Sequence, residues 1–512
     1  MTSPTKDVIC YEFTATLMAL FTALAGHFKS AGLYDSLIFA VRGADLKKVR
    51  GLTSFDTVAA IDTVVEPLLD WRDPDAVRAL ARENEKKYRL DFIDAYRADR
   101  LAGRGFIAAV WIPESSNYSA RSYIHALAYF NASVTFYERL FSQRRVACLI
   151  GYPGGLDGGI ATGMARAFGI PCRYLMHWRA RDRFAWAHDK SNLPPDLGAK
   201  LRDALREVDA AIKAGTTNLS APAPALYQGG EVTGLDNTIG LKSLRREMYA
   251  EVRRNVGHVV KRRVPGLKGR YSFPQNLWLI LRMWQLRRRN WRRRPRAPYR
   301  PPGPYVLFPL QVEPEITLSV EADTVVSQLS VIEWLAQSMP AGWTLVVKEH
   351  PFQTALRRRF FWRYVRGLPN TAIAPTLAPT EPLIANAAAV ATINSTVGYQ
   401  AAAAGIPVLT FDAQTPLSIL PHVFPAASYA DTRRIIRRIA DVGISREDRN
   451  RGGLALKTAW DRIGFELGLD YEAAFRTNAT LQPELVARIG DELHRSIQES
   501  AAAQVRAVRA AQ

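Results

Sequence analysis

The sequence predicts an α/β protein with two domains, each built on a parallel β-sheet. The chain has 512 residues, which is more than one ordinary hydrophobic core supports. Hydrophobic residues make up 48% of it and charged residues 23%, the balance of a globular rather than a disordered protein. Short apolar runs alternate with helical patterns of about ten to twenty residues, and this alternation is typical of βαβ units.

In the first half, apolar runs predict strands at 36–41, 105–112, 146–151 and 172–176. A long helix is predicted at 119–141, where Ile124, Leu127 and Val134 recur at helical spacing. The apolar stretch 13–28 is short for a bilayer span and lacks the basic flank of a signal peptide. We expect it to form a buried helix, with a membrane-inserted segment as the alternative.

In the second half, the alternation is more regular and favours a Rossmann-like domain. Strands are predicted at 305–310, 343–348, 371–374, 389–393 and 407–411. Helices are predicted at 323–337, at 354–365, from Glu381, and at 396–404. A Gly-Ile-Pro sequence follows a small-residue helix in both halves, at Gly169 and Gly405. Glycine there is expected to end the helix, and proline prevents its continuation.

A basic and then proline-rich segment separates the halves. From Arg253 to Arg300 there are sixteen Lys and Arg residues and no Asp or Glu, so much of the formal charge of +20 lies in this segment. We expect an N-terminal Rossmann-like domain at 1–252, a linker at 253–303, a second Rossmann-like domain at 304–430 and C-terminal helices at 431–512. Two such domains facing a cleft favour a GT-B architecture.

The three cysteines, Cys10, Cys148 and Cys172, are widely spaced and form no disulfide or zinc pattern. A reducing, cytoplasmic compartment fits this usage. The chain contains no P-loop, and no glycine-rich dinucleotide motif follows a strand. The sequence therefore does not favour a P-loop NTPase or a dinucleotide-binding enzyme.

Polar residues follow two predicted strands of the second half. Lys348-Glu349-His350-Pro351 comes after one strand, and Asn394-Ser395-Thr396 comes after another and opens a helix. Ligands bind at the carboxyl ends of parallel strands, and a helix N-terminus offers free N–H groups to phosphate. We expect an anion site formed by Lys348, His350, Asn394, Ser395 and Thr396. The alternatives are a surface turn at His350 and ordinary capping of the helix by the hydroxyl residues.

A glycine-rich turn at 151–159 places Asp157 between a strand and a helix in the first half. A carboxylate there is a candidate general base for an acceptor hydroxyl, or a nucleophile. The alternative is an Asp that caps the helix. His177 and Glu114 are weaker candidates for the same role.

Four stretches of the second half occur in order: Tyr305-Val306-Leu307-Phe308-Pro309-Leu310-Gln311-Val312-Glu313-Pro314-Glu315, then 348–351, 393–398 and 405–408. Together they resemble the bacterial capsule polysaccharide biosynthesis proteins. That family includes CMP-Kdo-dependent β-Kdo transferases, and the His350-Pro351 pair is similar to one in bacterial sialyl- and polysialyltransferases. The first half of the chain matches the family less well.

The resemblance implies a glycosyltransferase of GT-B fold that moves an acidic sugar, Kdo or a related nonulosonic acid, from a CMP donor to a surface or capsular glycan. It implies that His350, Ser395 and Thr396 contact the CMP phosphate. Glu313, Glu315 and Glu381 are candidates to bind the donor. No cofactor and no metal are expected, since protein groups can hold the leaving phosphate. A CDP-polyol phosphotransferase, a UDP-sugar enzyme and a non-catalytic membrane-associated scaffold remain alternatives.

The stretch 277–291 joins tryptophan and leucine to arginine, a pattern that suits an interfacial helix on anionic lipid. The expected membrane-surface residues are Trp278, Trp284, Arg287, Arg288, Arg289, Trp291, Arg292, Arg293 and Arg294. Such a helix would hold a cytoplasmic enzyme at the inner face of the membrane, near a lipid-linked acceptor and other assembly proteins. A solvated basic linker is the alternative. Nucleic acid is not expected as a partner, because no RRM, KH, HTH or zinc-finger signature is present.

Overall fold

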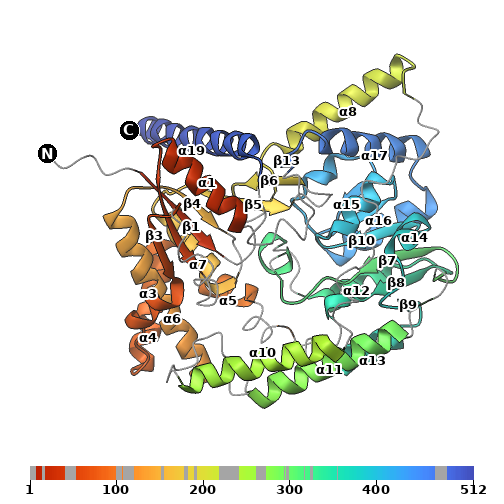
Figure 1. The fold of residues 1–512 in the computed structure, drawn as a ribbon. Helices are drawn as coiled ribbons and strands as arrows, with labels where there is room; N and C mark the ends of the chain where they lie inside the picture. The colour runs from red at the N-terminus through yellow and green to blue at the C-terminus, as the bar shows by residue number, and fades with distance from the viewer. Residues whose placement is uncertain are drawn as a thin grey trace. The chain divides into compact units, whose positions relative to one another are not determined.

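The computed structural model describes residues 7–13, 18–40, 54–99, 107, 120–151, 155–177, 183–189, 193–217, 241–260, 273–292, 295, 299–315, 317–322, 327–353, 356–466 and 481–511. The predicted strand at 105–112 lies outside these residues apart from a single position. The chain divides into two compact units, and the predicted α/β class with two Rossmann-like sheets is confirmed (Figure 1).

The two units are built from other segments of the chain than the four expected parts. Unit 1 consists of 1–98, 118–195 and 464–512, and unit 2 consists of 99–117 and 196–463. Residues 464–512 of the expected C-terminal part belong to unit 1, and residues 431–463 belong to unit 2. The basic segment belongs to unit 2. These boundaries depend on packing between distant segments, which the local composition of the chain does not report.

The sheet of unit 1 has the strand order β13-β6-β5-β4-β1-β2-β3. The strands are β1 (Val8–Phe13), β2 (Asp35–Ala40), β3 (Thr57–Ala60), β4 (Val146–Gly151), β5 (Cys172–His177), β6 (Arg183–Ala187) and β13 (Phe465–Glu466). Strands β1 to β5 pair in parallel, whereas β6 runs antiparallel to both β5 and β13. The predictions at β2, β4 and β5 are confirmed, and the expectation of a wholly parallel sheet is wrong at this edge.

The helices of unit 1 are α1 (Met18–Ser30), α3 (Ile61–Val65), α4 (Pro74–Tyr88), α5 (Phe92–Ala98), α6 (Ala120–Gln143), α7 (Gly155–Ala167) and α19 (Pro483–Ala511). The expected buried helix at 13–28 is α1, which begins later because β1 occupies the residues up to Phe13. Helices α1 and α19 lie side by side in Figure 1. Leu24 and Phe28 of α1 share one hydrophobic core with Leu493 of α19.

A buried arginine also ties α19 to the sheet. The Arg173 side chain in β5 donates from Nε to the Ser496 hydroxyl at 2.9 Å and from a terminal nitrogen to the Ser500 hydroxyl at 2.6 Å. Hydrogen bonds satisfy donors that would otherwise cost free energy in the interior. The position of α19 on this unit is therefore fixed by polar bonds as well as by apolar packing.

The sheet of unit 2 is entirely parallel, with the order β12-β11-β10-β7-β8-β9. The strands are β7 (Tyr305–Pro309), β8 (Thr344–Lys348), β9 (Thr371–Ala374), β10 (Ala389–Thr392), β11 (Val408–Thr410) and β12 (Val423–Pro425). All five residues of β7 are buried, as expected for a central parallel strand covered on both faces. All strands except β12 were predicted from the sequence.

The helices of unit 2 are α8 (Leu197–Lys213), α10 (Leu241–Val260), α11 (Phe273–Arg292), α12 (Gln328–Ser338), α13 (Arg359–Gly367), α14 (Thr380–Ala385), α15 (Thr396–Ala403), α16 (Tyr429–Asp441) and α17 (Arg446–Trp460). Gly405, which follows α15, has φ +69°, and Gly169, which follows α7, has φ +70°. Both glycines therefore end their helices in the left-handed conformation, as predicted.

Residues 273–292 of the basic segment form helix α11, which packs against α10. The prediction of a helix at 277–291 is confirmed, and this helix is grouped with unit 2. Within the described residues, no helix is both long enough and apolar enough to cross a bilayer.

Candidate functional site

The two predicted motifs lie at one edge of the unit 2 sheet. Strands β8 and β10 are the two neighbours of β7 and run parallel to it, so the three carboxyl ends lie together. Lys348 ends β8 and is followed by His350, and Thr392 ends β10 and is followed by Asn394, Ser395 and Thr396. The sequence prediction that these residues share one edge is confirmed by the strand order.

Gln311, which follows β7, joins the two motifs. Its side-chain nitrogen donates to the Asn394 carbonyl at 3.2 Å, and its own carbonyl accepts from the Arg357 guanidinium at 2.7 Å. The Gln311 backbone N–H donates to the Gln328 side-chain oxygen at 2.7 Å. Gln311 therefore holds the Asn394 turn to the residues that follow β8. No role for Gln311 was predicted, since a single glutamine after a strand is not specific for any function.

Arg357 forms the centre of a buried charge cluster with Glu313 and Glu349. The exposed fractions of the three side chains are 1%, 3% and 6%. Arg357 Nε donates to Glu349 Oε2 at 2.9 Å, and a terminal nitrogen donates to Glu313. Burial alone would lower the pKa of Arg357, but the two carboxylates outweigh it and raise that pKa. The guanidinium therefore stays charged and neutralises acids that burial would otherwise make costly.

Glu349 also positions the residue after it. Its Oε1 accepts the backbone N–H of His350 at 2.8 Å. The His350 ring is partly buried, and this burial, with the positive charges of Lys348 and Arg357, lowers its pKa to about 4. His350 is consequently neutral at pH 7. It can donate one ring N–H to a ligand oxygen, but it does not supply a positive charge.

Lys348, at the end of β8, is buried. Its Nζ donates to the Thr376 carbonyl at 3.2 Å, and burial lowers its pKa to about 8, against the opposing effect of Glu349. The ammonium group is therefore still largely protonated at neutral pH. It adds positive potential beneath the edge of the sheet, although its burial does not suit a direct contact with a ligand.

The Ser395 side chain does not cap the N-terminus of α15. Ser395 occupies the cap position, but its side chain accepts no N–H from the helix. Its hydroxyl lies 2.8 Å from the Thr392 hydroxyl, and its backbone N–H donates to the same Thr392 oxygen at 3.1 Å. The alternative of ordinary capping by Ser395 is therefore not observed. Thr396, the first helical residue, is exposed.

Asn394 is held in place by neighbouring side chains of unit 2. It is buried, its backbone N–H donates to the Gln311 side-chain oxygen at 3.4 Å, and its side-chain nitrogen donates to Glu321 at 3.3 Å. The predicted anion-binding residues thus fall into two groups. Ser395, Thr396 and His350 lie at least partly at the surface, whereas Asn394 and Lys348 lie beneath it.

The three glutamates expected to bind a donor are placed differently from one another. The Glu313 carboxylate is buried and accepts a hydrogen bond from Arg357. Its backbone N–H donates to the Gln353 side-chain oxygen at 3.3 Å, and its carbonyl accepts from the Gln353 side-chain nitrogen at 3.0 Å. A direct donor contact does not fit this buried position. Glu315 is half-buried, and Glu381 is exposed in the first turn of α14.

Asp157 lies in the first turn of α7 in unit 1, two residues beyond the start of the helix. It is half-buried, and its Oδ1 accepts the Tyr129 hydroxyl at 2.5 Å. The nearby glycines serve packing: a Cβ on Gly159 would lie 2.6 Å from the Ala95 Cβ of α5. His177 ends β5, and Glu114 lies outside the described residues.

The residues expected at a membrane lie on more than one face of α11. Trp278, Arg289 and Arg292 are exposed, and the Arg288 guanidinium lies 5.1 Å from the centre of the Trp284 ring. Arg287 is partly buried, which lowers its pKa against the effect of Glu247 in α10. Arg287 therefore does not belong to an exposed lipid-binding face. Trp291 is half-buried, and Arg293 and Arg294 lie outside the described residues.

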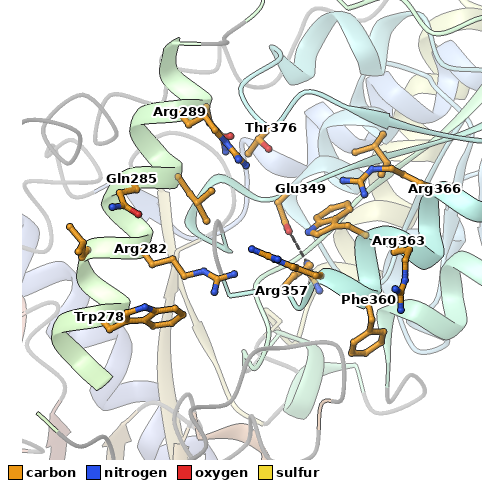
Figure 2. Close-up of a pocket in the computed structure, with 16 residues that line it drawn as sticks. Trp278, Arg282, Gln285, Arg289, Glu349, Arg357, Phe360, Arg363, Arg366 and Thr376 are labelled. Carbon is orange, nitrogen blue, oxygen red and sulfur yellow. Dashed lines mark hydrogen bonds and ion pairs between the residues drawn. The ribbon is translucent and has the colours of Figure 1, made fainter. Parts of the chain in front are cut away.

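An open pocket of about 1060 Å³ lies between α11 and α13 (Figure 2). Its lining includes Glu349, Arg357 and Thr376, but not His350, Ser395 or Thr396. It therefore borders the buried charge cluster, and the residues at the α15 N-terminus are not part of its lining. Among the described residues, no group of three or more His, Cys, Asp or Glu side chains is arranged to hold a metal ion.

Residues 266–414 match the family model described as capsule polysaccharide biosynthesis protein. This segment is therefore similar to the capsule polysaccharide biosynthesis proteins. It contains α11, the strands from β7 to β11, the buried charge cluster and both predicted anion-binding motifs. The resemblance found in the sequence is thereby confirmed for the part of the chain that carries the candidate site.

No curated protein matches the chain. Among solved structures, a UDP-GlcNAc 2-epimerase from Neisseria meningitidis bound to UDP-GlcNAc is 8% identical, over 97% of this chain and 100% of its own, with a TM-score of 0.30. KpsC, the beta Kdo 2,7 transferase of Thermosulfurimonas dismutans, is 12% identical over 62% and 80%, with a TM-score of 0.29. The calicheamicin glycosyltransferase CalG4 is 11% identical over 89% and 95%, with a TM-score of 0.28.

Proposed function

We propose that the protein is a glycosyltransferase of capsule or surface polysaccharide synthesis, which moves Kdo or a related nonulosonic acid from a CMP donor to a growing glycan. One observation carries the proposal. Within the segment that matches the capsule family, the α15 N-terminus and His350 lie at the same carboxyl edge of a parallel sheet.

The donor phosphate would bind at the α15 N-terminus. The first N–H groups of an α-helix lack intrahelical partners, and the helix dipole favours an anion there. In α15 the Gly398 N–H donates to the Ser395 carbonyl at 3.0 Å. The Ser395 hydroxyl bonds to Thr392 and therefore does not block the N–H groups of Thr396 and Val397. The Thr396 hydroxyl and the neutral His350 ring supply further donors, and the buried Lys348 ammonium adds a favourable potential.

In the proposed transfer, the acceptor hydroxyl attacks the anomeric carbon of the donor sugar and the bond to the CMP phosphate oxygen breaks. A base takes the hydroxyl proton, and the protein N–H and O–H donors stabilise the charge that develops on the phosphate. We assign the base, or the nucleophile of a two-step route, to Asp157. The Tyr129 hydroxyl holds this carboxylate as an acceptor in the absence of substrate.

Nucleotide titration with matched serine variants tests the donor site. The Ser395 hydroxyl caps no helix N–H, and when it accepts from the Thr392 hydroxyl it can still donate to a phosphate oxygen. Ser395→Ala should therefore lower CMP affinity several-fold, while the lost bond to Thr392 costs about 1 kcal/mol of stability. Ser428→Ala is the control, because the Ser428 hydroxyl does cap α16 by accepting the Asp431 N–H at 3.1 Å. This control should cost about 1 kcal/mol of stability and leave CMP affinity unchanged.

The same titration separates the donor classes. His350→Gln keeps a side-chain N–H but changes its position, and we expect CMP to bind about tenfold more weakly, which corresponds to about 1.4 kcal/mol. Tight binding of UDP with none of CMP or CDP would refute the CMP donor, and preference for a CDP-polyol would favour a phosphotransferase. A parent protein that transfers no sugar from any donor would favour the scaffold function.

We further propose that α11 holds the enzyme on an anionic membrane surface at the cytoplasmic side, close to a glycolipid acceptor. Trp284, Arg288 and Arg292 recur at helical spacing and line a second hollow of about 430 Å³. Arg288→Glu with Arg292→Glu should release the protein from phosphatidylglycerol vesicles and leave transfer to a soluble acceptor unchanged. Retention on the vesicles would refute the membrane proposal.

A further inference from the structure

The pocket between α11 and α13 has two helical walls. Trp278, Arg282, Gln285 and Arg289 recur at spacings of four, three and four, so they share one face of α11. Arg359, Phe360, Arg363 and Arg366 line the α13 side. Figure 2 shows the labelled residues of both helices around the space between them, with the Glu349–Arg357 pair between the two walls. The volume of about 1060 Å³ is sufficient for a ligand of several sugar rings.

The charge of this pocket is strongly positive. Its lining contains six arginines and one acidic residue, Glu349, which is already paired with Arg357. The other five arginines have no carboxylate among the lining residues. Arg282 and Arg359 line opposite walls, and burial together with the positive charge of Arg359 lowers the pKa of Arg282. An anion bound between the walls would relieve this repulsion.

The uncharged lining residues suit a saccharide. Trp278 is 44% exposed, although the Arg282 guanidinium lies 4.9 Å from its ring centre, and Phe360 is 37% exposed. Each therefore leaves aromatic surface on which a sugar ring can pack. Gln285, Asn290 and Thr376 can bond to sugar hydroxyls. The α13 wall is firmly anchored, because Phe361 and Val365 on its inner face are fully buried.

The pocket also adjoins the proposed donor site. Glu349 bonds to the His350 backbone, and the Thr376 carbonyl accepts from Lys348, so two lining residues contact the donor-side motif directly. A ligand held here would lie next to the carboxyl end of β8. The volume, the charge and the position together distinguish this pocket from a patch of solvated surface arginines.

We propose that the pocket between α11 and α13 binds the acceptor as an acidic oligosaccharide, whose carboxylate groups pair with the arginines of the two helices. The inference rests on the proposed glycosyltransferase function and specifies the chemistry of its acceptor. Arginine suits this ligand because its planar guanidinium binds a carboxylate through two parallel hydrogen bonds. Several arginines on each wall would select a chain with more than one acidic sugar over a neutral glycan.

Charge reversal on α13, compared with the same change on another helix, tests the proposal. Arg359→Glu with Arg363→Glu alters two lining residues four positions apart. Arg433→Glu with Arg437→Glu is the matched control, because these arginines are also exposed, also four positions apart, and lie on α16 outside the pocket. Binding of fluorescent sialic acid oligomers to the full chain would be measured beside neutral maltooligosaccharides, and thermal melting would confirm that each variant is folded.

We expect the parent to bind the acidic oligomer in a salt-sensitive manner and not the neutral one. The α13 variant should lose about tenfold or more in affinity, and the α16 variant should stay within about twofold of the parent. Equal losses in the two variants, or no loss in the α13 variant, would overturn the proposal.

Two further measurements identify the ligand. If the parent does not bind the oligomer and the α13 variant instead loses binding to phosphatidylglycerol vesicles, the pocket is a lipid site and the proposal fails. It also fails if the α13 variant loses CMP affinity while the oligomer still binds. If the parent binds no CMP but retains oligomer binding that depends on the α13 arginines, the donor assignment falls and the acidic-glycan pocket is supported.

Discussion

Replacing Arg357 with methionine tests whether the buried charge cluster organises the edge of the unit 2 sheet. The guanidinium is the shared partner of Glu313 and Glu349 and also donates to the Gln311 carbonyl. Methionine fills most of the same volume but carries no charge and no donor. The change therefore leaves two buried carboxylates and one carbonyl without their partner, and it creates little empty space.

The loss in the free energy of unfolding depends on whether the two carboxylates stay charged or take up protons. Removing one partner of a buried ion pair costs about 3–5 kcal/mol. A stranded carboxyl escapes by taking up a proton, and at pH 7 this costs about 3.7 kcal/mol for an ordinary glutamate pKa of about 4.3. Lys348 offers one compensating charge, because Glu349 acts on its pKa. We therefore expect a loss of about 4 kcal/mol in the free energy of unfolding.

The pH dependence adds a second test. Burial is the main cause that raises the pKa of Glu349 in the parent. A group whose pKa is raised on folding adds to the free energy of unfolding at low pH, and this addition is lost as the pH rises through the raised pKa. Without Arg357 this pKa rises further. The stability difference between parent and variant should thus be largest near pH 7 and shrink towards pH 5, as measured by urea denaturation at each pH.

Two controls accompany this measurement. Arg363→Met alters an exposed arginine of α13 and should change stability by less than about 0.5 kcal/mol. Adding Glu349→Gln to Arg357→Met removes one stranded charge and should restore part of the loss. A loss below about 1 kcal/mol at pH 7, or one that does not vary with pH, would refute the reasoning.

Three other predictions concern packing and titration. Gly398→Ala would place a Cβ 2.6 Å from the Thr392 Cγ2, so we expect a loss of about 1–3 kcal/mol by urea denaturation, and full stability would contradict that close contact. Burial lowers the pKa values of His350 and His422 to about 4, so folding stability should decrease as the pH falls from 6.5 to 4, and His422→Gln should flatten that decrease in the measured curve. Leu493→Ala removes a fully buried side chain between α19 and the unit 1 core and should cost about 2–5 kcal/mol in calorimetry; a much smaller loss would mean that α19 packs loosely.

Much of the unit 2 sheet could be predicted because its strands carry a local signal. Strands β7 and β8 are buried on both faces, so each reads as a continuous apolar run. Strands β12 and β13 have only three and two residues, too few to show a period. Strand β1 was missed because an apolar helix follows it closely, and the hydrophobic signals of the two elements merge.

The site was predictable to the extent that it depends on strand ends. Lys348, His350 and Ser395 follow strands that the sequence reveals, so their common edge could be inferred. Arg357 could not be assigned, because its partner Glu313 lies 44 positions away in the chain. The pairing of Glu313 and Glu349 through one arginine is a tertiary property, so the burial of the Glu313 carboxylate could not be expected from the sequence.

The place of α19 affects the order in which the protein is built. Residues 483–511 complete the hydrophobic core that surrounds β1, yet the ribosome makes β1 hundreds of residues earlier. All segments of unit 2 leave the ribosome before α19 does. Unit 2 can therefore reach its native state first, while the N-terminal segments wait with an unfinished core. During that interval the nascent chain exposes apolar surface, and chaperone binding to the early segments is the expected protection.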